Sequence, residues 1–456
     1  MTSLKRQFVE GVFYFSSGSL IVTLLHFFST VIIIRSLGLL EYGLFVLALS
    51  FYTILASFLE CGIGGVVLAD SSAAIGEKDY TKAKTLLKSY MKFEFVMGST
   101  LFLVALILSF MLSGLYDNVI GRLLLIIAFY LFTTSLQNAV SIVFYSLSKF
   151  KIFNLIHVAE ALMRFALVVV FIFLMSKGIL VAMMIYVVAQ LTGILLVIPS
   201  LLGVRNKLKP YPLSNKPLFK DAIKDHGKWA VFSLPIKRIG GQIHYWIVEY
   251  FLGVNSVALL GVAMRGTDIL KIFLQSFERV LMPITANIVK NWEKTKYLMN
   301  KSIKYNLWIS VVVAVPAIVF APYLIEIVFS GKYLEAVPIF RVLLLTLIPA
   351  SLVVIRPLFY ALRAQKYLFY SDVIIDALII FFDFVFIWVF GLIGVGVSMF
   401  LIAFLVFLIR VGFLRKFKPD FIIRVRDLFT IDDFDKKQLK LIMTKVKSKL
   451  LNCYVL

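Results

Sequence analysis

The chain has 456 residues, of which 61% are hydrophobic and only 16% are charged. Soluble domains carry charged residues at about a quarter of their positions, so this composition excludes a soluble globular protein and indicates many membrane-spanning segments. The net charge of +22 has to be explained by its distribution, because a basic chain can bind either nucleic acid or an anionic membrane surface.

The apolar segments, taken in chain order, predict a multi-pass α-helical membrane protein. A spanning helix needs about 20 mostly apolar residues. The first apolar segment is too long for the core of a cleaved signal peptide, so we expect it to remain as a helix. An even number of spans places both termini on the same side of the membrane. The twelve expected helices lie at 9–34, 43–69, 93–113, 122–146, 155–176, 179–202, 229–252, 257–282, 303–328, 339–361, 368–390 and 393–413.

Lys and Arg are concentrated on one predicted face of the membrane. The N-terminus, the loops after every second helix and the C-terminal segment carry most of the 47 basic residues. The opposite face carries only Arg35, Arg122, Lys177, Lys332 and Arg341. Because basic loops stay in the cytoplasm, this asymmetry predicts a plasma or inner membrane protein with both termini cytoplasmic. Topology and contact with anionic phospholipids then explain the charge, and no nucleic acid is needed.

A weak internal repeat divides the predicted helices into two groups of six. Leu37-Gly38 corresponds to Leu252-Gly253 at a spacing of 215 residues, and Phe144-Tyr145 corresponds to Phe359-Tyr360 at the same spacing. Two units of six helices keep the same orientation in the membrane, so an axis along the membrane normal relates them. Transporters built in this way bind cargo in a central cavity between their halves.

The C-terminal segment differs from the apolar part of the chain. Leu439, Ile442, Val446 and Leu450 recur at helical spacing opposite a row of lysines. This pattern predicts an interfacial helix on the anionic cytoplasmic leaflet, and a solvated charged tail is the alternative. The expected domains are an N-terminal six-helix lobe at 1–202, a basic cytoplasmic linker at 203–228, a C-terminal six-helix lobe at 229–413 and a basic amphipathic tail at 414–456.

Charged side chains occur inside several predicted spans, where each is costly and therefore a candidate functional residue. Arg265, Asp268 and Lys271 form a polar stripe on one helix, and Glu160 and Arg164 share a face of another. These charges can pair along their own helix, Glu160 with Arg164 and Arg265 with Asp268. Alternatively, cations in a cavity attract a multiply anionic group such as pyrophosphate, which Arg binds through two parallel hydrogen bonds. The candidate cavity cations are Arg164, Lys237, Arg238, Arg265, Lys271 and Arg356.

Three aspartates lie on one stripe of the predicted helix YSDVIIDALIIFFDF (370–384). We expect Asp372 to lie in the first turn, where a carboxylate interacts favourably with the helix dipole. We expect Asp383 to pair with a cation such as Arg356, and Asp376 to be the better candidate for a coupling proton or sodium ion. The candidate coupling or counter-ion carboxylates are Glu60, Glu160, Glu249, Asp268, Asp376 and Asp383.

Other recognisable chemical motifs are lacking in the sequence. His26 and His244 are isolated within spans and are expected to be bonded inside the helix bundle. Cys61 and Cys453 are far apart and indicate neither a disulfide framework nor a metal site. No spacing resembles a P-loop, a nucleotide-binding turn, a nucleophile motif or a metal cluster, so no catalytic residue and no metal is expected.

Four segments of the sequence are similar, in order and spacing, to segments of one known family. IIIRSLGLLEYG (32–43) is similar to an R-x-LG-x-x-x-YG opening, in which Arg35, Gly38, Tyr42 and Gly43 match and are expected to be structural. Segments 250–283, 328–343 and 390–399 are similar to later parts of the same family. The chain thus resembles the polysaccharide-biosynthesis flippases, the Wzx-type members of the MOP superfamily, over about residues 5–413.

The resemblance implies a two-lobed fold of twelve helices that moves a polyprenyl-pyrophosphate-linked oligosaccharide from the cytoplasmic to the outer leaflet. A proton or sodium gradient is expected to drive this movement, with no other cofactor. The implied partners are the lipid-linked oligosaccharide, anionic phospholipids and other membrane proteins of polysaccharide assembly. The resemblance therefore implies a transporter and not an enzyme.

Two other functions are weighed against this one. A cation-coupled multidrug exporter of the MATE type favours cationic cargo and an acidic, aromatic cavity, whereas Lys and Arg dominate the spans of the C-terminal half. A membrane glycosyltransferase or polymerase needs positioned acids or bases on the outer face, and the predicted outer loops are short. The flippase interpretation is therefore favoured, with the MATE-type exporter as the alternative.

Overall fold

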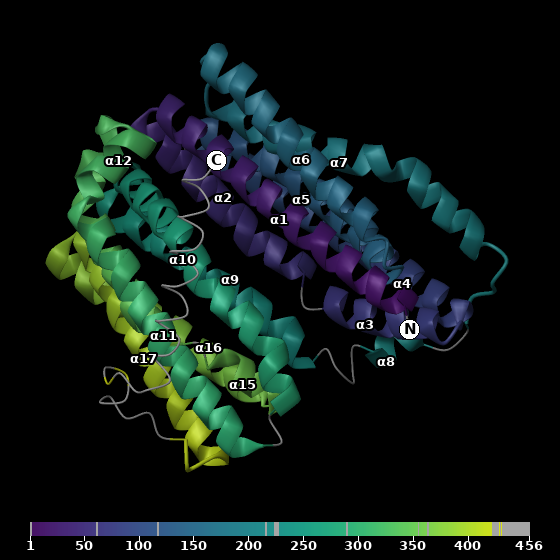
Figure 1. The fold of residues 1–456 in the computed structure, drawn as a ribbon. Helices are drawn as coiled ribbons and strands as arrows, with labels where there is room; N and C mark the ends of the chain where they lie inside the picture. Colours follow the sequence, from purple (N-terminus) through teal and green to yellow (C-terminus); the bar gives the residue numbers. More distant parts are fainter. Residues whose placement is uncertain are drawn as a thin grey trace, which may run out of the picture.

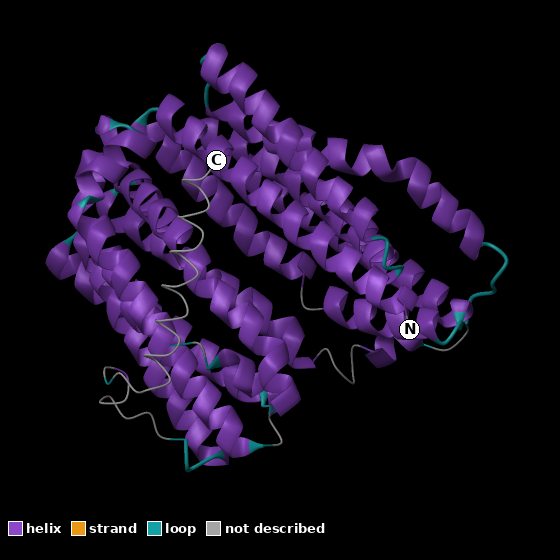
Figure 2. Cartoon of the chain, in the orientation of Figure 1, coloured by secondary structure: helices purple, strands orange, loops and turns teal. Residues whose placement is uncertain are grey.

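The protein consists of α-helices joined by short connections (Figure 2). The computed structural model describes residues 2–60, 63–115, 118–214, 217–222, 228–288, 291–353, 355–362, 364–421, 428 and 430. Within these ranges, the backbone alone is described at 2–17, 60, 112, 114–115, 118, 222, 228–234, most of 272–287, 360, 365 and 417. No β-strand occurs in the ranges described, so the predicted all-helical fold class is confirmed.

The N-terminal lobe contains six long helices and one short one. Tight turns separate them, as at Lys78, where φ is 62° and the next helix begins after Asp79. The Asp79 carboxylate accepts a hydrogen bond of 2.9 Å from the backbone N–H of Lys82, which caps that helix. The helices are α1 (Thr2–Ser36), α2 (Leu39–Glu60), α3 (Ile63–Gly76), α4 (Tyr80–Leu115), α5 (Asn118–Ser146), α6 (Phe150–Leu167), which continues as a π-helix (Val168–Leu174), and α7 (Ile179–Leu208).

The C-terminal lobe follows a short helix of the linker, α8 (Leu218–Ala222). Asn291 caps one of its helices by accepting a hydrogen bond of 3.2 Å from the backbone N–H of Lys294. The helices are α9 (Lys228–Leu252), α10 (Val254–Ile288), α11 (Trp292–Val319), α12 (Ala321–Phe329), a 3₁₀ helix (Gly331–Ala336), α13 (Val337–Leu345), α14 (Leu347–Ser351), α15 (Arg356–Ala361), α16 (Gln365–Phe390) and α17 (Leu392–Phe417).

Several predicted spans are interrupted in the structure. The span expected at 303–328 is divided between α11 and α12 at Phe320, and the span expected at 339–361 is divided among α13, α14 and α15. The span expected at 43–69 is covered by α2 and α3, and residues 61 and 62 lie outside the described ranges. A proline lies in the first turn of α12, where its missing N–H is tolerated and a helix start is favoured. The linker predicted to begin at 203 begins later, because α7 continues to Leu208. The tail predicted at 414–456 lies mostly outside the described residues.

Ten helical segments are long and apolar enough to cross a membrane, as judged by length and composition over the described residues. Two of the twelve predicted spans do not meet this standard. They correspond to α9 and α10, which have 25 and 35 residues. A helix of 25 residues extends about 37 Å and exceeds the ~30 Å hydrocarbon core, so length does not exclude them. Their described side chains include six charged ones: Lys237, Arg238, Glu249, Arg265, Asp268 and Lys271.

The internal repeat appears at matching places in the two lobes. In the N-terminal lobe α2 begins directly after Gly38, and in the C-terminal lobe α10 begins directly after Gly253, whose φ is +77°. The second repeated pair also lies at equivalent helix ends, since α5 ends at Ser146 and α15 ends at Ala361. These positions support the division into two lobes.

The two lobes meet at one end and separate toward the other. In Figure 1 the helices of both lobes converge near α12 and diverge toward α3 and α15. Among the described residues, one apolar core contains residues of both lobes, whereas three further cores lie within one lobe each. The contact is close: a methyl group at Gly43 of α2 would lie 2.2 Å from the carbonyl oxygen of Val254 in α10. Only glycine permits this approach.

Candidate functional site

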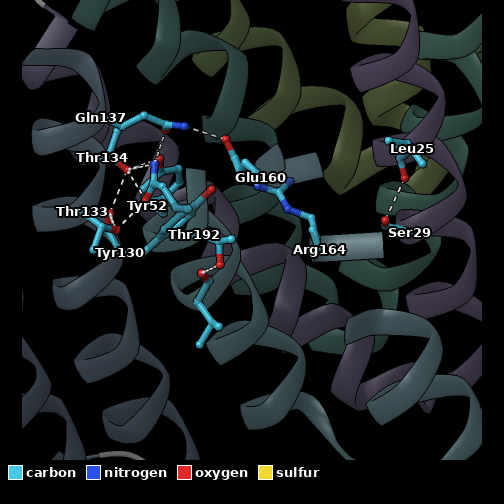
Figure 3. A network of polar contacts seen from close by, with 12 residues as sticks. Leu25, Ser29, Tyr52, Tyr130, Thr133, Thr134, Gln137, Glu160, Arg164 and Thr192 are labelled. Carbon is cyan, nitrogen blue, oxygen red and sulfur yellow. Dashed lines mark hydrogen bonds and ion pairs between the residues drawn. The ribbon is translucent and has the colours of Figure 1, made fainter. Parts of the chain in front are cut away.

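Buried polar side chains of α5, α6 and α7 form a network inside the N-terminal lobe (Figure 3). Glu160 and Arg164, one turn apart on α6, form an ion pair at 6% and 7% exposure. The Glu160 carboxylate also accepts a hydrogen bond of 2.7 Å from the side-chain amide of Gln137. The guanidinium of Arg164 lies 4.2 Å from the ring centroid of Tyr186. The predicted pairing of Glu160 with Arg164 is therefore confirmed.

The network continues from this ion pair toward α2, the helix that contacts the C-terminal lobe. Gln190 of α7 donates a hydrogen bond of 2.7 Å to the amide oxygen of Gln137 and one of 3.1 Å to the hydroxyl of Thr134. That hydroxyl is 2.8 Å from the hydroxyl of Tyr52 on α2. The sequence interpretation missed these uncharged residues. The sequence does contain a signal for them, because Gln137 and Gln190 lie in otherwise apolar spans. A side-chain amide inside the membrane needs hydrogen-bond partners.

A cavity of about 430 Å³ lies between the lobes, at α1 and α10. Its N-terminal side includes His26, whose buried Nε2 atom has no hydrogen-bond partner among the described residues. His26 is close enough to Glu160 and Arg164 to interact with them electrostatically. The cavity therefore lies next to the polar network. Its lining residues are Thr23, His26, Phe27, Thr30, Val31, Arg265, Asp268, Ile269 and Phe329.

Arg265 is the cation that the C-terminal lobe contributes to this cavity. Its side chain is exposed in the cavity, and it forms no ion pair with any residue in the described ranges. Asp268 instead pairs with Lys271, at 3.3 Å between the carboxylate and Nζ. The predicted pairing of Arg265 with Asp268 is therefore wrong. Arg265 and Lys271 are each three residues from Asp268, so both are within reach of its carboxylate. In the structure the side chain of Asp268 is oriented toward Lys271.

Two of the three aspartates of α16 have buried partners on neighbouring helices. Asp383 lies 2.5 Å from Nδ1 of His244 on α9, so the predicted partner Arg356 is wrong and the expected bonding of His244 within the bundle is confirmed. Asp372 pairs with Arg410 of α17 at 2.9 Å. The dipole role predicted for Asp372 is also wrong, because α16 begins at Gln365, well before this residue.

Asp376 differs from the other two aspartates. A methyl group at Gly240 of α9 would lie 2.1 Å from Oδ1 of Asp376, so this carboxylate packs directly on the α9 backbone. Its buried Oδ2 atom, like Oδ1 of Asp383, has no hydrogen-bond partner in the part of the chain that is described, but Asp376 also lacks an ion pair there. The titratable groups that interact with it electrostatically are Asp372, His244 and Lys237. This is a half-buried carboxylate with an unused acceptor.

The remaining predicted site residues lie in other places. Arg356 begins α15 and is half-buried, without an ion pair to any described residue. Glu249 lines a separate apolar cavity of about 230 Å³, together with Trp246 and residues of α2 and α5. Arg238 is half-buried on α9. The side chain of Glu60 lies outside the described residues. Among the predicted site residues whose side chains are described, the structure thus brings Arg265 and Asp268 to the cavity, with Lys271 paired to Asp268 and with Glu160 and Arg164 beside the cavity.

The end at which the lobes meet is tied by hydrogen bonds between them. Lys332 donates from Nζ to the carbonyl oxygens of Arg35, at 2.8 Å, and Leu37, at 2.5 Å. The hydroxyl of Tyr333 donates to the carbonyl oxygen of Ile34 at 3.0 Å. All of these residues belong to the face that the charge asymmetry predicts to be outside. The cavity is therefore closed at the predicted outer end.

We expect Lys332→Ala to weaken this closure. Exposed charged hydrogen bonds to carbonyls contribute on the order of 1 kcal/mol, so the population open at this end should rise roughly fivefold. Electron resonance measures the distance between spin labels at residues 122 and 341, in a background without the native cysteines. A longer distance reports the open population. The matched control is Lys366→Ala on the surface of α16. An unchanged distance distribution would contradict a role for Lys332.

Comparisons with solved structures identify the fold. An inward-facing multidrug resistance MATE family transporter of the MOP superfamily is similar over 90% of this chain and 98% of its own, with a TM-score of 0.75 and 15% identity. An outward-facing one has a TM-score of 0.64 with 17% identity, over 91% and 94% of the two chains. A MOP superfamily transporter from Pyrococcus furiosus, described as having a binding pocket of reverse polarity, has a TM-score of 0.63 with 16% identity, over 90% and 96%. The chain therefore has the two-lobed fold of these transporters and is a multi-pass membrane protein.

Sequence comparisons identify the family. An uncharacterized membrane protein of Methanocaldococcus jannaschii is 31% identical over 124 residues, which cover 26% of this chain and 24% of that protein. The match thus spans about a quarter of the length of that relative. The family model described as polysaccharide biosynthesis protein matches residues 32–338. The chain, with its polar cavity between two lobes, therefore belongs to the polysaccharide biosynthesis protein family.

Proposed function

We propose that this protein moves a polyprenyl-pyrophosphate-linked oligosaccharide from the inner to the outer leaflet of the cytoplasmic membrane. Both termini lie in the cytoplasm in this proposal. Its partners are the lipid-linked oligosaccharide, anionic phospholipids and other membrane proteins of polysaccharide assembly. Membership of the polysaccharide biosynthesis family and a transporter fold support this function.

The exposed guanidinium of Arg265 in the central cavity is the observation that carries the proposal. A cation without an ion-pair partner, in a site partly withdrawn from water, favours an anionic ligand. Arg offers two parallel N–H donors that match phosphate oxygens. Lys271 carries a second positive charge nearly two turns further along α10, where it pairs with Asp268. The site is therefore suited to a pyrophosphate rather than to a cationic drug.

Alternating access accounts for the transfer between leaflets. The lobes are joined at the predicted outer end and diverge toward the predicted cytoplasmic end, so cargo enters from the inner leaflet. Breaking the Lys332 and Tyr333 contacts and closing the opposite end would expose Arg265 to the outer leaflet. The polyprenyl chain stays in the lipid while the charged headgroup and sugars cross inside the cavity, which avoids the cost of a charge in hydrocarbon.

Asp376 is the candidate for coupling transport to a gradient of protons or sodium ions. Its buried Oδ2 atom has no hydrogen-bond partner among the described residues, and the carboxylate packs between α16 and α9 of the C-terminal lobe. A carboxylate in this state gains stability by binding a proton or a small cation. Binding of that cation on one side of the membrane and release on the other would bias the conformational cycle.

We expect Asp376→Asn to remove the coupling without unfolding the protein, because Asn keeps the shape of Asp. One elementary charge across 100 mV corresponds to ~2.3 kcal/mol, so loss of one coupled cation should lower the accumulation ratio of the cargo by up to roughly 50-fold. Transport into vesicles with and without an imposed gradient measures this ratio. Asp420→Asn, on an exposed site, is the matched control. A variant that still responds fully to the gradient would remove Asp376 from the mechanism.

The direct test of the function uses the purified full chain in lipid vesicles. A fluorescent polyprenyl-pyrophosphate oligosaccharide is added, and a membrane-impermeant glycosidase reports the fraction in the accessible leaflet. We expect protein-dependent transfer of this lipid and no transport of ethidium. Movement of ethidium but not of the glycolipid would overturn the proposal and favour the MATE-type exporter. The same assay is the readout for the cavity variants.

A further inference from the structure

A second cavity, of about 570 Å³, lies in the N-terminal lobe between α4 and α7, at the ends of these helices that are predicted to be cytoplasmic. Residues of α4, α5 and α7 and the residue that follows α7 line it, and none of them lines the central cavity. In Figure 1 α4 and α7 belong to the lobe that contains the N-terminus. We call this cavity the α4–α7 cleft. Its lining residues are Lys84, Leu87, Lys88, Met91, Val143, Leu201, Leu202, Val204, Arg205, Leu208 and Lys209.

The rim of the α4–α7 cleft is basic. Lys84 donates hydrogen bonds to the carbonyl oxygens of Lys209, at 3.2 Å, and Tyr211, at 2.5 Å, so it holds the end of α7 against α4. Lys88, Arg205 and Lys209 are exposed and form no ion pair with any residue in the described ranges. Among the described residues, no carboxylate lines the cleft. Three unpaired cations around one cavity favour an anionic ligand.

The floor of the cleft is apolar. Leu87, Val143 and Val204 are buried there, and Met91 and Leu201 are half-buried and line the cavity wall. A free phosphate or a soluble metabolite gains nothing from this surface. An acyl chain, in contrast, gains about 0.8 kcal/mol for each methylene group that it buries. The combination of a basic rim and an apolar floor therefore favours an amphiphile.

The cleft lies at the depth where the two parts of a phospholipid meet. Nearer the membrane centre α7 exposes Leu195, Leu196 and Ile198, which indicates that this face contacts lipid. At the other end the rings of Tyr80 and Tyr211 lie 4.9 Å apart, and tyrosines are enriched at the membrane–water interface. The basic rim is therefore at headgroup level and the apolar floor is at acyl-chain level.

We propose that the α4–α7 cleft binds one anionic phospholipid of the inner leaflet. Its phosphate lies among Lys88, Arg205 and Lys209, and an acyl chain lies along Met91 and Leu201. This lipid is not the transported cargo, because the cleft shares no lining residue with the cavity between the lobes. Basic pockets between membrane helices on the cytoplasmic side are known to hold such headgroups. The site would fasten α7 to α4 while the lobes move.

The experiment compares two triple variants of the full-length protein in detergent, by native mass spectrometry. The first removes the rim charges by Lys88→Gln, Arg205→Gln and Lys209→Gln, and it keeps Lys84, which orders the end of α7. The control removes the same number of charges from exposed positions outside the cleft, by Lys207→Gln, Lys220→Gln and Lys294→Gln. Dioleoyl phosphatidylglycerol is the probe, and dioleoyl phosphatidylcholine is the uncharged comparison.

Each basic residue near an anionic lipid contributes about fivefold to binding, so we expect the rim variant to bind the first phosphatidylglycerol on the order of 100-fold more weakly. The control should bind as the unmodified protein does, and phosphatidylcholine should bind weakly to all three. Equal losses in the two variants, or equal binding of the two lipids, would overturn the proposal.

Two further measurements identify the ligand class. Inorganic pyrophosphate should not displace the bound phosphatidylglycerol, and displacement would mean that the cleft is a site for soluble anions. Met91→Asn with Leu201→Asn should weaken lipid binding without changing the basic rim. Unchanged binding would mean that no acyl chain lies along these two residues. Because these readouts measure lipid binding and not transport, they hold whether or not the proposed cargo is correct.

Discussion

Arg265→Gln is expected to reduce the initial rate of glycolipid transfer on the order of 100-fold, which corresponds to ~2.7 kcal/mol. This is the range for hydrogen bonds between a charged donor and a charged acceptor, and Arg265 is the exposed cation of the central cavity. Glutamine keeps much of the length of the side chain but removes the charge and the planar fork. The measurement is the glycosidase-accessibility assay in vesicles, at several concentrations of the fluorescent lipid.

Two further variants separate the chemistry of Arg265 from a general loss of charge. Arg265→Lys keeps the charge without the bidentate fork, so we expect an intermediate rate. Arg122→Gln removes an exposed arginine far from the cavity and should leave the rate unchanged. If Arg265→Gln transported the glycolipid as fast as Arg122→Gln, the cavity would not bind the pyrophosphate through this residue.

Glu160→Ala is expected to lower the free energy of unfolding by about 3–5 kcal/mol, which is the cost of leaving a buried charge without its partner. Arg164 is only 7% exposed and would lose its carboxylate, and the side-chain amide of Gln137 would lose an acceptor. Thermal unfolding in detergent, followed by circular dichroism, measures the effect. Glu326→Ala, at an exposed glutamate of α12, is the matched control and should change stability little.

The double variant Glu160→Leu with Arg164→Met distinguishes a structural pair from a functional one. Replacing a buried ion pair by apolar side chains of similar volume is often neutral or stabilising, so we expect most of the lost stability to return. A folded double variant without transport would assign the pair to the transport cycle. Stability that stays as low as in Glu160→Ala would instead show that the rest of the network requires the pair.

Glu160 and Asp376 are carboxylates of the fifth predicted span of each lobe, and the structure gives them different surroundings. In the structure Glu160 lies on α6 and Asp376 lies on α16. Glu160 has an arginine one turn further along α6 and a glutamine on α5, whereas Asp376 faces the bare backbone at Gly240. Pseudo-symmetry preserves the position of a carboxylate but not its partners. This difference leaves Asp376, and not Glu160, with an unused oxygen for a coupling cation.

Predictions about ion pairs succeeded only where the pair lies on one helix and the geometry leaves a single choice. Glu160 with Arg164 was predictable because a separation of four residues brings the side chains together in any α-helix. Asp268 had two cations within reach on its own helix, and the sequence interpretation selected the wrong one. A periodic pattern defines which side chains share a face, but it does not define their rotamers.

The sequence by itself determined an all-helical membrane protein, the order of its spans and its division into two lobes. These properties follow from the hydrophobicity and charge of local segments. Such segments insert into the bilayer and orient in it according to their own composition, whatever the tertiary fold. Only the tertiary structure decided which buried charges pair and which face the cavity. His244 and Asp383 are 139 residues apart in the chain and 2.5 Å apart in space, and Asp372 reaches Arg410 on the next helix. Such contacts depend on how helices rotate and pack against one another, and no local pattern contains that information.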